Sequence, residues 1–280
     1  MKYSIKQLFV LMAILLFSGC IETVDAPWNT NPIPVVFSII TPGHPVQVYI
    51  GKSFNESDTA KTIPYPEAKV YVCGPDSAWV ELVKREGNKS IFVDTLNLLS
   101  VTKGKTYSLL VELKDETLHA QTTVPTEMGI ITQAESFFPF TSSSNAGIYD
   151  NGEMIPAKLG VINVKYTLPD NKEYGCYLGA FSKLIENSSY LNSESYQNSY
   201  FYCPYDSATF VLSLITVDPF LKKFRVAENI QFMQSEDLPS LIMGHYGGVR
   251  PAFSNIQNGV GLFGSFVTNN KTVEAIMLPE

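Results

Sequence analysis

Short runs in which apolar and polar residues alternate fill the chain from residue 33 to about residue 125. In Val46–Ile50 and Ala68–Cys73, for example, every second residue is aliphatic or alanine. Alternation with a period of two places the apolar side chains on one face of a β-strand. Turn residues such as Gly74-Pro75-Asp76 separate the runs. About seven runs, with a turn roughly every eight to twelve residues, predict an Ig-like antiparallel β-sandwich over residues 33–128.

The pattern continues after a boundary at residues 126–129, and residues 129–280 are predicted to form a second, β-rich domain. Apolar stretches typical of strands cover residues 159–168, 174–181, 209–217, 254–267 and 273–277. The segment 185–207 is polar and rich in tyrosine, and is predicted to be an inserted loop.

One segment of the second half changes to a helical period. Asp218 is a good N-cap and Pro219 suits the first turn of a helix. Apolar residues then recur three or four positions apart, with basic and acidic residues off that face. This spacing predicts one amphipathic helix over about residues 219–234.

The first 20 residues predict where the protein resides. Lys2 and Lys6 precede the ten-residue apolar run Leu8–Phe17, and the small pair Ser18-Gly19 leads directly to Cys20. This is a signal peptide, residues 1–19, followed by a cysteine placed as in the bacterial lipobox, although Phe17 stands where leucine is usual. We therefore expect Cys20 to be lipidated. The alternative is an ordinary cleaved signal followed by a chance cysteine.

Residues 20–32 are polar and interrupted by prolines, so they are predicted to tether the lipid to the folded body. Ile21 does not match the aspartate that retains some lipoproteins at the inner membrane. The expected location is therefore the outer membrane, on either its periplasmic or its cell-surface face.

Composition narrows the function classes. Apolar residues make up 45% of the 280 residues and charged residues 17%, which indicates a packed globular body. The net charge is -7, and loss of Lys2 and Lys6 with the signal makes it -9. An acidic chain without a basic patch gives no reason to expect that it recruits nucleic acid or anionic lipid.

No motif for catalysis, a metal or a cofactor is present in the sequence, so none of these is predicted. There is no HExxH, CxxC or GxSxG pattern, and the histidines are His44, His119 and His245. His245 lies between glycines and is the most site-like of the three. The run Asp150–Glu153 allows a calcium site or a solvated turn, of which the turn is favoured.

The remaining cysteines are Cys73, Cys176 and Cys203. A disulfide between Cys176 and Cys203 is compatible with their positions in the same half of the chain, and leaves Cys73 as a buried thiol.

The tyrosine-rich segment gives the strongest binding signal. Tyrosine offers a large, rigid contact area, and asparagine and serine form adaptable hydrogen bonds, as in antibody paratopes and sugar-contacting loops. The alternative is that these aromatic side chains pack against the sandwich. The candidate residues are Tyr190, Tyr196, Tyr200, Tyr202 and Tyr205.

Four motifs together resemble a known family. They are Cys20 with the first turn at Thr41-Pro-Gly, the strand Pro66–Val72, the segment Gly104–Val111 with its continuation to Pro125, and the glycine-rich Ser254–Gly264. In order and spacing they are similar to the bacterial outer-membrane lipoproteins called domain of unknown function 4249. The resemblance implies an Ig-like N-terminal domain, a β-rich C-terminal domain and a lipid anchor, and it implies no activity. Such proteins are often thought to accompany TonB-dependent outer-membrane receptors, which suggests nutrient uptake.

The leading hypothesis is therefore a non-enzymatic, lipid-anchored accessory protein of the outer membrane. It would bind a TonB-dependent receptor, or an extracellular glycan or peptide, through its tyrosine-rich segment and sandwich loops. The alternatives are a surface hydrolase acting on glycans or peptides, and a purely structural or adhesive surface protein.

Overall fold

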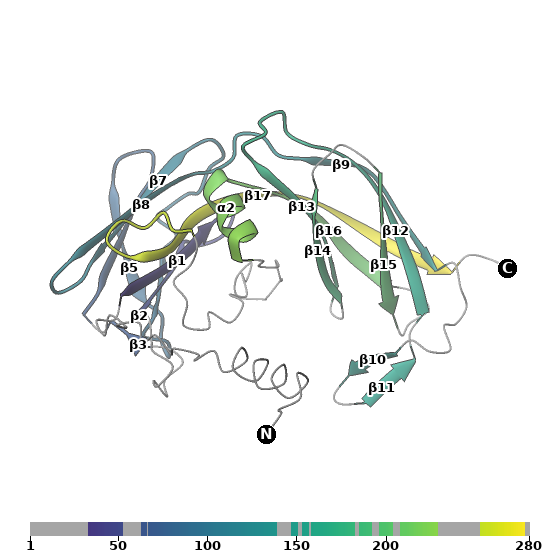
Figure 1. Ribbon diagram of the computed structural model, residues 1–280, viewed down its shortest axis with the longest axis horizontal. Coiled ribbons are helices and arrows are strands. Elements are labelled where there is room, and N and C mark those ends of the chain that lie inside the picture. Colours follow the sequence, from purple (N-terminus) through teal and green to yellow (C-terminus); the bar gives the residue numbers. More distant parts are fainter. Residues whose placement is uncertain are drawn as a thin grey trace, which may run out of the picture. The chain divides into compact units, whose positions relative to one another are not determined.

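The structure is a computed structural model, and it describes residues 33–52, 63–65, 67–138, 147–150, 153–156, 158–182, 185–191, 196–203, 208–228 and 253–277. Strands hold 57% of the chain and helix 4%, which confirms the mainly β fold (Figure 1). The predicted signal peptide, Cys20 and the tether lie outside the described residues. No helix among the described residues is long and apolar enough to cross a membrane.

The first half has the strand order of an Ig-like sandwich. Its strands are β1 (Pro34–Ile40), β2 (Gln47–Lys52), β3 (Ile63–Pro64), β4 (Lys69–Cys73), β5 (Trp79–Lys84), β6 (Ile91–Val93), β7 (Thr106–Glu112) and β8 (Thr117–Thr123). One sheet runs β1-β2-β6-β5 and the other β4-β7-β8, as strands ABED and CFG do in Ig domains. β5 belongs to both sheets, because Val83 and Lys84 pair with β6 and its earlier residues pair with β4.

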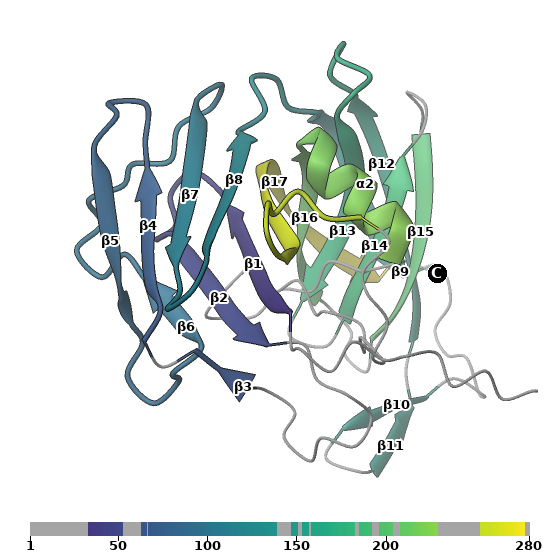
Figure 2. The same ribbon diagram turned by 60° about the vertical axis from the view of Figure 1, so that its left-hand side comes forward.

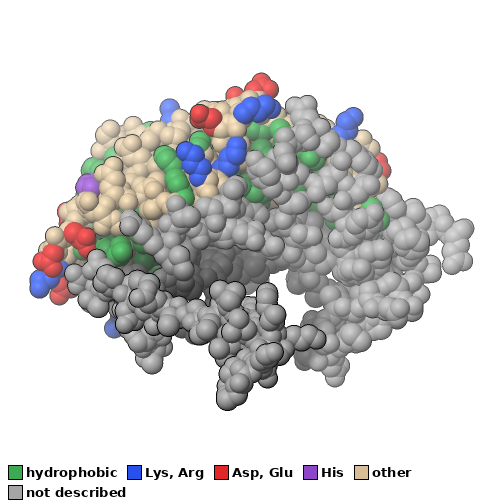
Figure 3. Space-filling model, in the orientation of Figure 1, with side chains coloured by type: hydrophobic (Ala, Val, Ile, Leu, Met, Phe, Trp, Pro, Cys, Tyr) green, Lys and Arg blue, Asp and Glu red, His purple; other side chains and the backbone are tan. Residues whose placement is uncertain are grey.

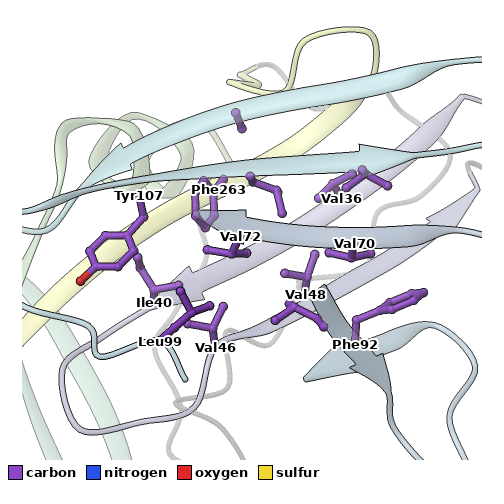
Figure 4. Close-up of a cluster of buried hydrophobic side chains, with 14 of the residues drawn as sticks. Val36, Ile40, Val46, Val48, Val70, Val72, Phe92, Leu99, Tyr107 and Phe263 are labelled. Carbon is purple, nitrogen blue, oxygen red and sulfur yellow. The ribbon is translucent and has the colours of Figure 1, made fainter. Parts of the chain in front are cut away.

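The alternating pattern of the sequence explains this sandwich. The inward residues of both sheets form one buried cluster (Figure 4), which includes Val36, Val48, Val70, Phe92 and Tyr107. β1 alternates strictly between buried and half-buried positions, and so do the first four residues of β2. Phe263, far along the chain in β17, is fully buried in the same cluster. The first sandwich therefore draws part of its core from the C-terminal segment.

Tyr107 fixes the loop that leads into β7. Its hydroxyl donates to the Ser100 carbonyl at 2.7 Å and accepts from the Thr102 N–H at 2.8 Å. The side chain is fully buried. A tyrosine at the start of this strand that bonds back to the preceding loop is the tyrosine corner of Ig-like folds.

We expect Tyr107→Phe to lower the free energy of unfolding by about 1–3 kcal/mol, because the Thr102 N–H and the Ser100 carbonyl lose their partner. Urea unfolding of the two proteins measures the difference. Ser100→Ala keeps the backbone carbonyl and is the control, with little expected change. Equal stability of Tyr107→Phe and the parent chain would contradict this role.

The second half is built from a second set of strands. They are β9 (Ile130–Phe138), β10 (Gly147–Asp150), β11 (Glu153–Pro156), β12 (Lys158–Thr167), β13 (Gly175–Ser182), β14 (Ile185–Leu191), β15 (Tyr196–Cys203), β16 (Ala208–Val217) and β17 (Val260–Met277). The order is β14-β13-β16-β17, with β17 pairing β9, β9 pairing β12 and β12 pairing β15. Side chains of β9 and β12 bury a second core with those of β13 and β16, among them Ile162, Leu178 and Leu214.

The helix α2 (Pro219–Glu228) covers the other face of β13, β16 and β17 (Figure 2). Leu221 and Phe224 are fully buried there, against Tyr177, Val217 and Leu262. The predicted helix therefore exists and begins where Asp218 and Pro219 placed it. Its predicted continuation over 229–234 lies outside the described residues.

β17 joins the two groups of strands. Its residues Val260–Ser265 run parallel to β1, Phe266–Ala275 pair antiparallel with β16, and Ala275–Met277 run parallel to β9. The sequence had predicted two separate strands over this region, and the structure has one of 18 residues from Val260. Because β17 takes part in both halves, the domain boundary near residue 129 stays a prediction.

The prediction of a loop over 185–207 is wrong for most of that segment. β14 pairs with β13 and β15 pairs with β12, so the segment supplies two strands. Its polar residues hid the strands, because the sequence shows no clean apolar alternation there. Tyrosine nevertheless favours strands.

Candidate functional site

Asp218 is the most buried acidic group among the described residues, and it joins three elements. Its side chain has no exposed surface. Oδ1 accepts the Leu221 N–H at 2.8 Å, which caps α2 as the sequence predicts. Oδ2 accepts the Thr122 hydroxyl at 2.6 Å, the Ser265 hydroxyl at 2.9 Å and the Ser265 N–H. Burial raises the pKa of Asp218, and these hydrogen bonds oppose the rise.

This junction of Asp218, Thr122 and Ser265 links β8, α2 and β17. Thr122 and Ser265 are themselves buried, and their hydroxyls lie 3.0 Å apart. Every hydrogen bond to the carboxylate comes from within the fold, and no ligand reaches a group without exposed surface. The junction therefore holds β8, α2 and β17 together.

The glycine-rich motif Ser254–Gly264 connects two of the same elements, β8 and β17. The Asn255 side chain accepts the Phe263 N–H at 2.9 Å and donates to the carbonyls of Phe263 and Gln121. Asn258 has a positive φ of 62° and donates to the Thr117 carbonyl. The Gln257 N–H donates to the His119 carbonyl at 2.8 Å. The motif thus attaches the start of β17 to β8, which explains its residues by structure rather than by ligand binding.

The tyrosines of the predicted binding segment fall on different strands. Tyr196, Tyr200 and Tyr202 lie in β15, where they pair with Lys165, Val161 and Leu159 of β12. Tyr190 lies in β14 and pairs with Tyr177 of β13. Tyr205 lies outside the described residues. The four described residues are therefore not all on neighbouring strands, because β14 pairs with β13 and β15 pairs with β12.

Register places positions 196, 200 and 202 of β15 on the same face as their partners Lys165, Val161 and Leu159 of β12. Ile162 and Val164 of β12 are fully buried in the second core, whereas Val161 is half-buried and Lys165 is exposed. Residues paired across two strands share a face. Positions 196, 200 and 202 of β15 therefore share the outward face of β12. Among the described strands, β15 pairs with β12 alone, so it forms an edge of the sheet.

The proposed disulfide between Cys176 and Cys203 is absent. Cys176 is a buried free thiol in β13, and its Sγ lies 3.7 Å from the Thr216 hydroxyl. Burial raises the pKa of this thiol. Cys203 ends β15, opposite Lys158, and β15 is paired with β12 rather than with β13. Cys73 is also free and is half-buried rather than fully buried.

Other candidate groups lie apart. His44 is exposed in the turn after β1, His119 is exposed on β8, and His245 lies outside the described residues. Asp150 and Glu153 pair across the β10–β11 hairpin. Within the part of the chain that the structure describes, no three His, Cys, Asp or Glu side chains gather closely enough to hold a metal ion. On the face in Figure 3, described acidic and basic side chains are interspersed.

Sequence reasoning missed the junction. The pattern Asp218-Pro219 indicated a helix cap and nothing more. The partners Thr122 and Ser265 are 96 and 47 residues away from Asp218. Thr122, the last residue but one of the strand β8, gave no signal of a buried partner.

Comparison with known proteins adds little. No family model matches the chain, and no curated protein is similar to it. A DUF4785 family protein from Legionella pneumophila is among the solved structures that align, with 12% identity over 66% of this chain and a TM-score of 0.26. The alignment spans 52% of that protein. A likeness at this level supports no statement about function.

Proposed function

We propose that this protein is a lipid-anchored binding protein of the bacterial outer membrane, which recognises its partner through the outward face of β15. One observation carries the proposal: the register puts three tyrosine positions, 196, 200 and 202, on the same face of an edge strand. Tyrosines arranged this way offer flat, amphipathic contact area at low entropic cost.

The sequence supports the rest of the proposal. Cys20 follows a signal peptide and a small-residue pair, so lipid attachment there would retain the body at the membrane. The resemblance to domain of unknown function 4249 suggests a TonB-dependent receptor as partner, in nutrient uptake. An extracellular glycan or peptide is the ligand such a receptor system would share with this chain.

The test is co-purification of the receptor with the tagged, lipidated chain from detergent-solubilised outer membrane. Replacing Tyr196, Tyr200 and Tyr202 with serine should lower the recovered receptor roughly ten-fold or more, since buried tyrosines dominate many interfaces. Substitution leaves the strands in place, whereas deleting residues 186–203 would remove all of β15 and all of β14 except Ile185.

Tyr190→Ser is the matched control, because it makes the same chemical change on the other edge strand. It should leave recovery unchanged, and the melting temperature of both variants should match the parent. Full recovery with the triple variant would show that the β15 face is not the binding surface.

A further inference from the structure

The loop between β6 and β7 exposes two large apolar side chains at its tip. Leu96 is 75% exposed and Leu98 is 64% exposed, the two highest values among the large hydrophobic residues that the structure describes. Leu99, the next residue, points into the first core, beside Ile40 and Val46 (Figure 4). Because Leu99 is anchored in the first core, Leu96 and Leu98 remain exposed to solvent at the tip of the loop.

The tip is fixed by its own hydrogen bonds. Asp94 is buried, and its carboxylate accepts the Leu98 N–H at 3.1 Å and the Leu99 N–H at 2.8 Å. The Asn97 N–H donates to the Asp94 carbonyl, and Asn97 adopts a positive φ of 51°. The Thr95 N–H donates to the Val93 carbonyl.

Tyr107 fixes the other end of the loop through Ser100 and Thr102, as described above. Most backbone N–H groups of the tip thus have partners inside the loop. A segment that leaves water for an apolar environment must satisfy its backbone groups internally. A loop that recognises a protein through its backbone would instead leave such groups available.

The charges of the loop suit an anionic surface. Lys103 and Lys105 are exposed, and the one acidic side chain among residues 94–105 is the buried Asp94, so the loop differs from the chain as a whole, whose net charge is -7. Trp79 is 49% exposed at the same end of the sandwich. It begins β5 directly after the turn at Gly74, where an added Cβ would lie 3.7 Å from the Leu99 side chain. Tryptophan is enriched where membranes meet water.

We propose that the loop of residues 94–105 docks on a lipid bilayer with anionic headgroups, with Leu96 and Leu98 entering its outer edge and Lys103 and Lys105 contacting the headgroups. The docking would orient the body beside its anchor. Two leucines and two lysines bind weakly by themselves, and a lipid at Cys20 makes such weak contacts effective by raising the local concentration.

This proposal rests on the lipid anchor of the proposed function, and the tether permits it. The strand β1 extends about 23 Å from Pro34 to Ile40, at roughly 3.3 Å per residue, and Ile40 is at the end of the sandwich that carries the loop of residues 94–105. The tether of residues 20–32 reaches at most about 43 Å at a similar rise. The loop end can therefore lie on the membrane that holds the anchor.

Trp79 provides the test. The chain has two tryptophans, so Trp28→Phe in the tether leaves Trp79 as the sole reporter. The lipidated Trp28→Phe chain is placed in vesicles of phosphatidylcholine and phosphatidylglycerol, in which the phosphatidylcholine carries bromine on its acyl chains. Insertion to a depth of ~5–10 Å should quench Trp79 fluorescence roughly two-fold. Leu96→Asp with Leu98→Asp should abolish the quenching.

The control is Ile130→Asp, which changes another exposed apolar residue, on β9, and should leave the quenching intact. An unquenched Trp79 in a chain that floats with the vesicles overturns the docking loop but keeps the anchor. A chain that fails to float with the vesicles overturns the anchor itself. Quenching that requires vesicles with native outer-membrane proteins assigns the loop to a protein partner and also overturns the proposal.

Discussion

Replacing Asp218 with asparagine should lower the free energy of unfolding by about 3–5 kcal/mol. One carboxylate oxygen accepts the Leu221 N–H and the other accepts the Ser265 N–H. The amide NH₂ of asparagine would therefore face a backbone N–H in either orientation. Urea unfolding, followed by circular dichroism, measures the change.

The exposed Asp76 offers the matched control, since its side chain accepts a hydrogen bond from the Ala78 N–H at the surface. Asp76→Asn makes the same chemical change where water can replace the lost contact, and it should change stability by less than about 0.5 kcal/mol. Similar losses for the two variants would mean that the buried junction is not a major source of stability.

The same group should make stability depend on pH. Burial raises the pKa of Asp218 above the ordinary value of 3.8, so the folded state holds the proton more tightly than the unfolded state does. The contribution of this group is then fully present below the unfolded pKa, and it is lost as the pH rises through the folded pKa. The difference in free energy of unfolding between the parent chain and Asp218→Asn should therefore shrink as the pH rises from the unfolded pKa of Asp218 through its higher folded pKa. A difference that grew over this window would contradict a raised pKa.

Gly261→Ala should be the other severe change, with an expected loss of about 4 kcal/mol or more, or failure to fold. Gly261 has a φ of +125°, and an added Cβ would lie 1.9 Å from the Val36 carbonyl oxygen. Gly261 pairs with Val36 in the parallel β1–β17 ladder. The clash involves backbone on both sides, so it can be relieved only by moving β17 away from β1, which would disturb the buried Phe263.

Gly43→Ala separates this clash from conformational strain. Gly43 also has a positive φ, of +83°, but no heavy atom lies within 4 Å of its added Cβ. It should cost only about 1 kcal/mol, the penalty of the left-handed conformation. Guanidinium unfolding of both variants makes the comparison, and equal losses would show that close packing of β17 on β1 is unimportant.

Prediction from sequence succeeded where the signal was local and failed where it was not. The strands of the first half follow from their alternation, and α2 starts where its cap and proline indicate. The strands β14 and β15 were missed because polar residues fill them. A disulfide was inferred from sequence distance alone, and the structure instead places Cys176 in β13 as a free thiol. The candidate tyrosines were grouped by proximity in the chain, and the ladders separate them.

The sequence by itself determined three features: the mainly β fold, which residues of a strand with alternating polarity are buried, and the start of the helix. Each of these depends on neighbours within a few residues. It also carries the predicted lipid attachment at Cys20. Only the tertiary structure decided that β17 completes the first sandwich, that Thr122 and Ser265 meet Asp218, and which tyrosines share a face. These contacts join residues as far apart as Val35 and Val260, which are 225 positions from each other in the sequence. Alternation specifies which face of a strand is buried, but it does not specify the strand that lies beside it.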